Sequence, residues 1–271
     1  MKLEAYVKKN ADDGLLTWAR ESEAAHRFGV SLREVEDAAL RAGILPLRYL
    51  RNRNTIGIGQ QLRLLRSRVA VIGCGGLGGH VIEALARLGV GSITAVDPDV
   101  FEESNLNRQV FSSINVLGRN KAEVAAERVA EINPAVACVP VASAWTKSGG
   151  NALIQGHDVV VDALDRISVR LELALSCGGM GIPLVHGGIG GWYGQVTTQM
   201  PGEDSLQKIY GVGKSDRGIE AELGNPPFVP AVVAGIEAAE VCKLLLHEGA
   251  VLRGRLLLID LLDMIIQEIS L

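Results

Sequence analysis

Paired cysteines and long apolar runs are both missing from this 271-residue sequence. Its four cysteines, Cys74, Cys138, Cys177 and Cys242, lie far apart and form no C-x-x-C pair. This predicts that the chain has no zinc site and no disulfide framework. No uninterrupted apolar run approaches the roughly 18 residues that a membrane-spanning helix needs. We therefore expect no membrane segment.

Positive charge is also scarce, since the formal net charge is −4. That balance argues against a dedicated surface for nucleic acid or anionic membrane. The first 13 residues carry charges where a secretory signal would need an apolar stretch, so a cytoplasmic, reducing location is expected.

What the sequence does have is apolar residues and glycine. Hydrophobic residues make up 48%, enough for a sizeable core, which excludes wholesale disorder. The 32 glycines exceed the usual share of about 7% but form no repeat, so we expect them to serve turns and close backbone contacts in a compact fold.

Residues 1–47 are predicted to be a helical extension. Ser31 followed by Glu34 fits a capping box at a helix start, and the helix would end near Gly43. A DNA-reading helix-turn-helix is an alternative. A small helical cap on the main body is favoured because basic residues are balanced by acidic ones.

From Arg68 onward, short β-branched runs alternate with segments of helical spacing. This rhythm predicts right-handed crossovers and a Rossmann-like α/β fold, with a mainly parallel sheet and helices on both faces. The predicted strands are 68–73, 92–97, 136–141, 158–162 and 183–186, and the predicted helices are 77–88, 120–132 and 166–180.

Beyond Gly190 the pattern changes. Residues 192–200 alternate like a strand with one wet face, and 201–230 are rich in Gly, Pro and charge, which is typical of a functional or mobile loop. An apolar helix over 231–247 and a closing hairpin of antiparallel C-terminal strands over 255–271 complete a single domain spanning 48–271.

A glycine-rich loop follows the first strand of the predicted sheet. Gly73-Cys-Gly75-Gly76-Leu-Gly78 contains G-x-G-x-x-G between a strand and a helix, and Asp97 ends the next strand. Such glycines allow a tight turn and the close approach of a phosphate to the positive end of a helix, while the acidic residue binds ribose hydroxyls. Alone, the motif indicates a nucleotide, and NAD is the usual default.

Polar residues after Asp97 make NAD less favoured. A long polar segment replaces the direct passage into a helix, and it supplies groups suited to a triphosphate: Asn105, Arg108, Gln109 and, at the start of the following helix, Lys121. Asp99, in the same segment, is a further candidate for binding the nucleotide. Asp165 comes just past the fourth strand, at a sheet end where α/β folds bind ligands, and could hold a divalent metal. Solvated surface charge is the alternative for each residue taken singly.

These segments together resemble the ThiF/HesA/MoeB family, the bacterial relatives of ubiquitin-activating enzymes. Besides the glycine loop, the resemblance rests on Arg48-Tyr-Leu-Arg51-Asn, Ser104-Asn-Leu-Asn-Arg-Gln109, Gly118-Arg-Asn-Lys121 and Asp162-Ala-Leu-Asp165. The Ser-Asn-Leu-x-Arg-Gln signature is the most specific of them.

The resemblance implies an adenylyltransferase that uses ATP to convert a carboxylate into an acyl-adenylate with release of pyrophosphate. The expected acceptor is the C-terminal glycine of a small ubiquitin-fold sulfur-carrier protein. By the same likeness, Gly73, Gly75, Gly76 and Gly78 would form the phosphate turn and Asp97 would hold ribose. Asn105, Arg108 and Lys121 would contact phosphates with support from Gln109, Asp165 would bind Mg²⁺, and Arg51 would reach the nucleotide of the partner in a homodimer.

Two departures from the family pattern bear on the chemistry. The C-x-x-C pairs that hold zinc in many members are absent, and 201–230 contains no cysteine, so we expect adenylation without a covalent enzyme–acyl step. Arg166 stands where relatives often have Asn. Adenylation of a small-molecule or peptide carboxylate, a nicotinamide-dependent oxidoreductase and a non-catalytic nucleotide-binding module remain alternatives. His186 is expected to be structural. Trp192 and Tyr193 are expected to be buried, and a surface that faces a partner is the alternative.

Overall fold

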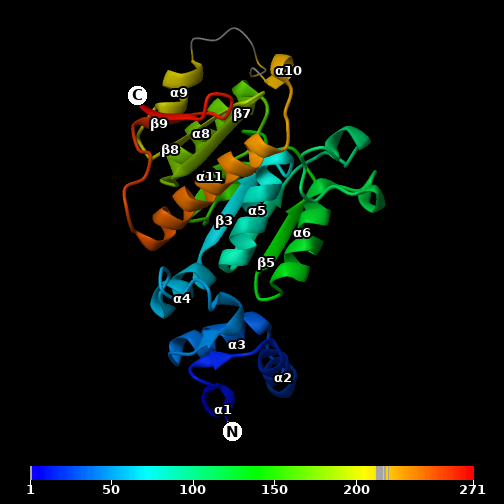
Figure 1. The fold of residues 1–271 in the computed structure, drawn as a ribbon, viewed down its shortest axis with the longest axis vertical. Coiled ribbons are helices and arrows are strands. Elements are labelled where there is room, and N and C mark those ends of the chain that lie inside the picture. Colours follow the sequence, from blue (N-terminus) through cyan, green and yellow to red (C-terminus); the bar gives the residue numbers. More distant parts are fainter. Residues whose placement is uncertain (1, 212–215, 217, 219) are drawn as a thin grey trace.

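The computed structural model describes residues 2–211, 216, 218 and 220–271. Its centre is an eight-stranded sheet in the order β10-β9-β8-β7-β6-β3-β4-β5 (Figure 1). The strands are β3 Arg68–Ile72, β4 Ser92–Val96, β5 Ala137–Val141, β6 Val159–Asp162, β7 Leu184–Gly190, β8 Tyr193–Gln199, β9 Arg255–Asp260 and β10 Ile265–Ser270. Strands β3 to β7 pair in parallel and β8 to β10 antiparallel, as the sequence predicts.

Helices cover both faces of this sheet. One face carries α5 Gly76–Leu88, α6 Lys121–Ile132 and α11 Phe228–Leu246, and the other carries α7 Asn151–Ile154, α8 Ile167–Met180 and α9 Ser205–Tyr210. Alternate side chains of β3 divide between the two cores, with Val69 and Val71 on the α5 side and Ala70 and Ile72 on the α8 side. A strand buried on both faces must be apolar throughout, which explains the uninterrupted β-branched runs.

The N-terminal helices form a small cluster with its own core. They are α1 Leu3–Asn10, α2 Trp18–Phe28 and α3 Leu32–Arg41, accompanied by the parallel pair β1 Leu15–Leu16 and β2 Leu45–Pro46. The predicted capping box is present, because the Ser31 hydroxyl accepts from the Glu34 N–H at 3.2 Å and Glu34 accepts in return from the Ser31 N–H at 2.8 Å.

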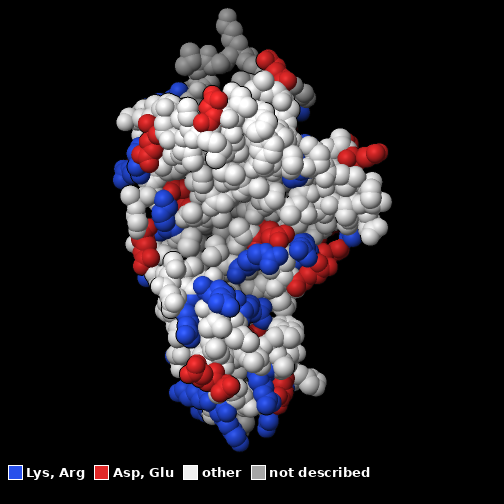
Figure 2. Space-filling view, viewed as in Figure 1, with Lys and Arg blue, Asp and Glu red and all other residues white. Residues whose placement is uncertain are grey.

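Helix α4 Ile58–Arg66 joins this cluster to β3, after the short 3₁₀ helix η1 Leu47–Tyr49. The α3 helix packs against α4: Arg33 donates to the Leu65 carbonyl at 3.0 Å and Asp37 pairs with Arg66 at 2.7 Å. Helix α3, which would be the second helix of a helix–turn–helix, therefore has one side packed against the chain's own main body. On the face shown in Figure 2, positive and negative side chains are interspersed over the N-terminal helices, and positive ones gather over α4.

The segment 201–230 departs from the sequence prediction. It contains α9 and the short α10 Glu220–Leu223, and α11 starts at Phe228 instead of Ala231. Pro230 lies in the first turn of α11, where backbone N–H groups have no partner inside the helix, so proline is tolerated there. Two further 3₁₀ turns, η2 Glu103–Asn105 and η3 Ile114–Val116, shape the polar segment after β4. None of the described helices is long and apolar enough to cross a bilayer.

Candidate functional site

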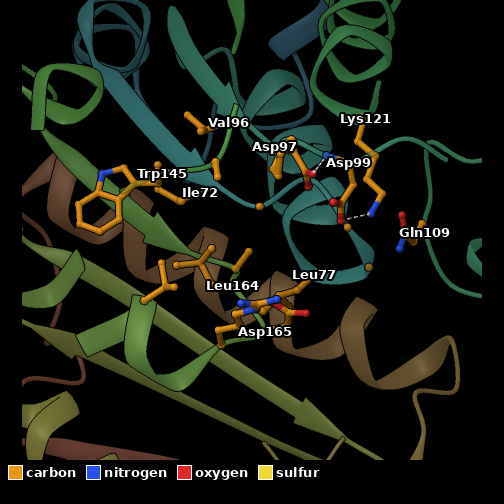
Figure 3. A pocket seen from close by; sticks show the side chains of 18 of the residues that line it. Ile72, Leu77, Val96, Asp97, Asp99, Gln109, Lys121, Trp145, Leu164 and Asp165 are labelled. Atoms are coloured by element: carbon orange, nitrogen blue, oxygen red, sulfur yellow. Dashed lines mark hydrogen bonds and ion pairs between the residues drawn. The ribbon is translucent and has the colours of Figure 1, made fainter. Parts of the chain in front are cut away.

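A cleft of about 1020 Å³ opens at the carboxyl ends of β3, β4 and β6 (Figure 3). The chain leaves β3 toward β4 on one side and returns to β6 on the other, so this is the topological switch point where α/β sheets bind ligands. Of the twelve residues predicted for the site, ten line this cleft: Gly73, Gly75, Gly76, Asp97, Asp99, Asn105, Arg108, Gln109, Lys121 and Asp165. Gly78 and Arg51 are not in its wall.

The glycine loop requires its glycines at two positions. Gly73 has φ +101°, and a Cβ there would come within 2.5 Å of the Ala163 carbonyl oxygen. A Cβ on Gly78 would lie 1.8 Å from the Gly73 carbonyl oxygen. Gly78 thus acts by letting the loop close on α5, while Gly75 and Gly76 bring the N-terminus of α5 to the cleft. An anion there would meet free backbone N–H groups and the positive end of the helix dipole.

Asp97 braces this loop from the end of β4. Its two carboxylate oxygens accept from the Cys74 N–H at 2.7 Å and from the Asp99 N–H at 2.8 Å. Burial raises the pKa of Asp97 above its usual value, against the lowering effect of these two donors. Each oxygen keeps a further lone pair, so the predicted contact with ribose is compatible with this bracing role.

Lys121 and Asp99 form an ion pair at the polar end of the cleft, with Nζ 3.1 Å from Oδ2 (Figure 3). Lys121 is the first residue of α6, which Asn120 caps by accepting from the Ala122 N–H at 3.0 Å. The cap and the buried stem of Lys121 fix where its ammonium group emerges.

The Ser104–Gln109 signature supplies a second cation beside the glycine turn. Arg108 packs along Gly76 and is held by the Ser104 carbonyl at 3.0 Å and the Asn107 amide oxygen at 2.8 Å. Asn105 uses its amide oxygen to accept from the Glu102 N–H at 3.0 Å, which stabilises the turn. Gln109 is buried next to Gly75, and its Oε1 has no partner among the described residues.

Asp165 lies across the cleft from Lys121, beside Leu77 and Leu164 (Figure 3). Its carboxylate is exposed, as is the neighbouring Arg166. Within the described residues, no three His, Cys, Asp or Glu side chains gather as a ready-made metal site. One carboxylate does fit Mg²⁺ that arrives on nucleotide phosphates, because that ion commonly keeps waters and takes one or two protein carboxylates.

The other end of the cleft is apolar. Ile72, Val96, Leu164 and Trp145 form this wall (Figure 3). Trp145 follows β5 in a segment without a motif, so its place in the cleft could not be predicted from the sequence. A Cβ on Gly150 would lie 2.3 Å from the indole nitrogen, so glycine at that position makes room for the ring.

Arg51 is exposed in the turn before α4, outside the cleft of its own chain. The neighbouring residues of the same motif are structural. Arg48 pairs with the buried Glu21 and with Glu36 at 3.4 Å, and the Tyr49 hydroxyl lies 3.1 Å from Glu36. Arg48 and Tyr49 thereby fix the N-terminal helices to the sheet domain, which leaves Arg51 as the motif residue free to meet another molecule.

All four cysteines are free and at least half-buried. Burial raises the pKa of Cys138 and of Cys177 to about 12 and that of Cys74 and Cys242 above the ordinary thiol value. None of them has the lowered pKa that activates a thiol nucleophile. The absence of a covalent enzyme–acyl step stays a prediction that this chemistry supports.

His186 is completely buried, with both ring nitrogens bonded, Nδ1 to Asp162 at 2.8 Å and Nε2 to the Tyr210 hydroxyl at 2.9 Å. Trp192 and Tyr193, in contrast, are exposed at the β7–β8 turn, where Trp192 packs on Phe228 with ring centroids 4.6 Å apart. The expectation that these two aromatic residues are buried is therefore wrong. The turn connecting two antiparallel strands leaves them outside both cores.

Comparison with known proteins agrees with this geometry. The sequence pattern of the ThiF family matches residues 49–271. The chain belongs to the ThiF family. The predicted resemblance is thereby confirmed for the part of the chain from η1 to the C-terminus.

Two curated relatives are similar in sequence to most of this chain. The chain is 42% identical over 216 residues to the SAMP-activating enzyme E1 of Haloferax volcanii, covering 79% of this chain and 80% of that protein. It is 33% identical to the molybdopterin-synthase adenylyltransferase of Escherichia coli, covering 78% and 86%. The predicted adenylyltransferase activity agrees with these relatives, and the nicotinamide alternative finds no support among them.

Solved structures show the same ThiF-type fold. The structure of E. coli MccB with ATP has a TM-score of 0.70 at 22% identity and covers 92% of this chain and 82% of that chain. E. coli tRNA N6-threonylcarbamoyladenosine dehydratase, TcdA, has a TM-score of 0.62 at 27% identity and covers 74% and 94%. The fold class predicted from the sequence is confirmed.

Proposed function

We propose that this chain adenylates the C-terminal carboxylate of a small ubiquitin-fold sulfur-carrier protein at the expense of ATP. The observation that carries the proposal is the convergence of Arg108, Lys121 and Asp165 on one cleft beside the glycine turn. The names of the two curated relatives, an E1 that activates SAMP and an adenylyltransferase of molybdopterin synthase, support a protein carboxylate as the substrate.

The cleft has a polarity that suits ATP. Its apolar end, formed by Ile72, Val96 and Trp145, would take the adenine, and Asp97 would take the ribose at the end of β4. The triphosphate would then run along the N-terminus of α5 toward Arg108 and Lys121. In this order the α-phosphate would lie near the glycine turn and the leaving pyrophosphate among the cations.

Positioning and charge stabilisation account for the chemistry. A carboxylate oxygen attacks the α-phosphorus, the bond to the bridging oxygen breaks, and pyrophosphate leaves with the electron pair. Lys121 and Arg108 would stabilise the negative charge that develops on the phosphates, and Lys121 would exchange Asp99 for phosphate oxygens. Bound through Asp165, Mg²⁺ would neutralise phosphate charge.

An exposed aromatic surface next to the cleft favours a protein over a small acid as the acceptor. Trp192 and Tyr193 follow Ile189 of the cleft wall, and Phe228 follows Asn225 of the same wall. Clustered exposed aromatic residues are typical of protein interfaces. A carrier bound there would have its C-terminal tail at the cleft mouth.

Arg51 cannot complete the cleft of its own chain, so we propose that it acts in a homodimer, at the nucleotide of the partner. An arginine supplied in trans is worth roughly 10³ to 10⁵ in rate in other phosphoryl-transfer enzymes. This role also accounts for the different positions of Arg48, which is bonded internally, and Arg51, which is exposed.

The test is exchange of labelled pyrophosphate into ATP. Carrier proteins ending in Gly-Gly, carriers lacking that dipeptide, and small carboxylic acids would be compared at equal concentration. We expect exchange only with the intact carriers. Exchange that requires only a small acid would overturn the carrier assignment, and ATP binding without exchange for any carboxylate would overturn the enzymatic one.

A further inference from the structure

A buried polar network lies beneath the turn that presents Asp165. It contains Asp162 and His186, both fully buried, together with Arg170, Tyr210 and Gln195. Of these, only Arg170 lines the cleft. The other four residues of the network do not line the cleft, so they can influence it only through the residues that they contact.

Donors and acceptors in this network have one consistent arrangement. Arg170 donates to the Tyr210 oxygen at 2.9 Å and the Gln195 amide nitrogen donates to it at 2.5 Å, which occupies both lone pairs. The Tyr210 proton therefore goes to His186 Nε2 at 2.9 Å. His186 is then neutral, with its proton on Nδ1 donated to Asp162 at 2.8 Å. Burial also lowers the pKa of His186, which favours the neutral ring.

The same network grips the backbone next to Asp165. Asp162 accepts from the Leu164 N–H at 3.0 Å, and Arg170 Nε donates to the Leu164 carbonyl at 3.0 Å, with Nη2 bonded to the same oxygen. Both backbone polar groups of the residue before Asp165 are thus fixed. These hydrogen bonds therefore determine the direction in which the Asp165 side chain leaves the backbone.

Tyr210 comes from a helix, as Arg170 of α8 does, whereas the other three members lie on strands. It ends α9, in the segment that follows β8, and its ring lies against His186 with centroids 5.5 Å apart and beneath the Arg170 guanidinium at 5.6 Å. It contributes the one oxygen on which Arg170, Gln195 and His186 converge.

We propose that Tyr210 is a positioning residue for Asp165, acting through Arg170 and the Leu164 carbonyl. The inference rests on the proposed function in one respect, namely that Asp165 contacts the metal ion bound with the nucleotide. Residues that orient a metal-binding carboxylate from behind typically change metal affinity or activity by about 10-fold to 100-fold when they are removed.

The variant that tests this is Tyr210→Phe, which removes one oxygen and keeps the ring. The matched control is Tyr6→Phe, because Tyr6 lies in α1 of the N-terminal cluster, outside the wall of the cleft. Binding of Mn²⁺ with ATP is measured by electron paramagnetic resonance, and the Mg²⁺ dependence of pyrophosphate exchange is measured alongside. We expect Tyr210→Phe to raise the half-saturating metal concentration by about 10-fold or more, while Tyr6→Phe leaves it unchanged.

A double-mutant cycle shows whether the effect passes through Asp165. In an Asp165→Asn background, Tyr210→Phe should produce no further change in metal binding, since the carboxylate it positions is gone. Equal effects in both backgrounds, or a lower melting temperature with unchanged metal binding, would show that Tyr210 is merely structural and would overturn the proposal.

Nitrogen NMR on the unmutated protein tests the arrangement without relying on a variant that folds. His186 should be neutral with its proton on Nδ1. A proton on Nε2 would contradict the network. If the protein binds Mn²⁺ and ATP yet exchanges no pyrophosphate, the proposed function fails while the metal-binding comparison still decides the role of Tyr210.

Discussion

Lys121 keeps its stem buried in the wall of the cleft and pairs its ammonium group with an exposed carboxylate. The residue is only 7% exposed, whereas the Asp99 side chain is 66% exposed. A cation held in this way has a fixed position but a partner that water can replace. It can pass from Asp99 to a phosphate oxygen without moving its backbone.

Replacing Lys121 should therefore damage catalysis far more than stability. We expect Lys121→Met to reduce pyrophosphate exchange by about 10² to 10³, the range seen when one stabilising donor is removed from an active site. Lys208→Met, on the exposed side of α9, is the control and should exchange like the unmodified chain. A loss of pyrophosphate exchange below threefold for Lys121→Met would show that Lys121 is not part of the catalytic site.

At the scale of elements, the strand–loop–helix unit from β3 to α5 determines whether the cleft exists. The loop folds back so closely that Gly73 and Gly78 nearly touch. Asp97 from the neighbouring strand then ties the loop by its backbone. Substitutions here change the shape of the cleft as well as the stability of the chain.

Two glycine-to-alanine changes should shift the stability of the chain in opposite directions. Gly78→Ala puts a Cβ 1.8 Å from a carbonyl oxygen and should lower the melting temperature and abolish ATP binding. Gly179→Ala, near the end of α8, meets nothing within 4 Å and should stabilise the chain by about 0.5–1 kcal/mol, because alanine has the higher helix propensity. Calorimetry with and without ATP would measure both. Retained ATP binding in Gly78→Ala would mean that the loop relaxes.

At the scale of the whole molecule, buried charge joins the N-terminal helices to the sheet domain. Glu21 and Glu36 are fully buried, and Arg48 is the cation between them. Tyr49 extends the joint to Asn133 at the end of α6, with a hydrogen bond of 2.8 Å. We therefore expect the stability of this joint to depend on pH.

Burial raises the pKa of Glu36 from 4.5 to about 7. Between those pH values the folded chain binds a proton that the unfolded chain releases, so the free energy of unfolding should fall as the pH rises from about 4.5 to about 7 and level off above. The contribution is on the order of 3 kcal/mol. Chemical denaturation across this range should show the slope, and Glu36→Gln should remove most of it. The exposed control Glu123→Gln should keep it, and an equal slope in both variants would contradict the assignment to Glu36.

A homodimer with Arg51 acting in trans predicts subunit complementation. Arg51→Ala and Asp165→Asn should each be inactive, yet a refolded mixture should regain exchange, because a mixed dimer contains one site with both residues intact. Asp165→Asn mixed with Lys121→Met is the matched control. It should stay inactive, since both changes fall in the cleft of one chain. No recovery in the first mixture would place Arg51 outside the partner's site.

Sequence patterns determined most of the sheet and ten of the twelve predicted cleft residues. The reason is local: a strand buried on both faces must be apolar along its whole length, and a turn as tight as that of Gly73 admits only glycine. The polar residues that follow successive strands then meet, because parallel strands end at the same edge of a sheet. The roles predicted for the cleft residues stay predictions, including those of Asn105 and Gln109 and the ligation of Mg²⁺ by Asp165.

Tertiary structure alone decided the rest. Tyr210 lies 40 residues from Arg170 in the chain and carries no motif, so only the folded chain brings their side chains together. The same holds for Arg48 and its buried carboxylates, and for Trp145 at the apolar end of the cleft. A residue's partners across elements depend on how helices and sheet pack, and local spacing along the chain contains no record of that packing.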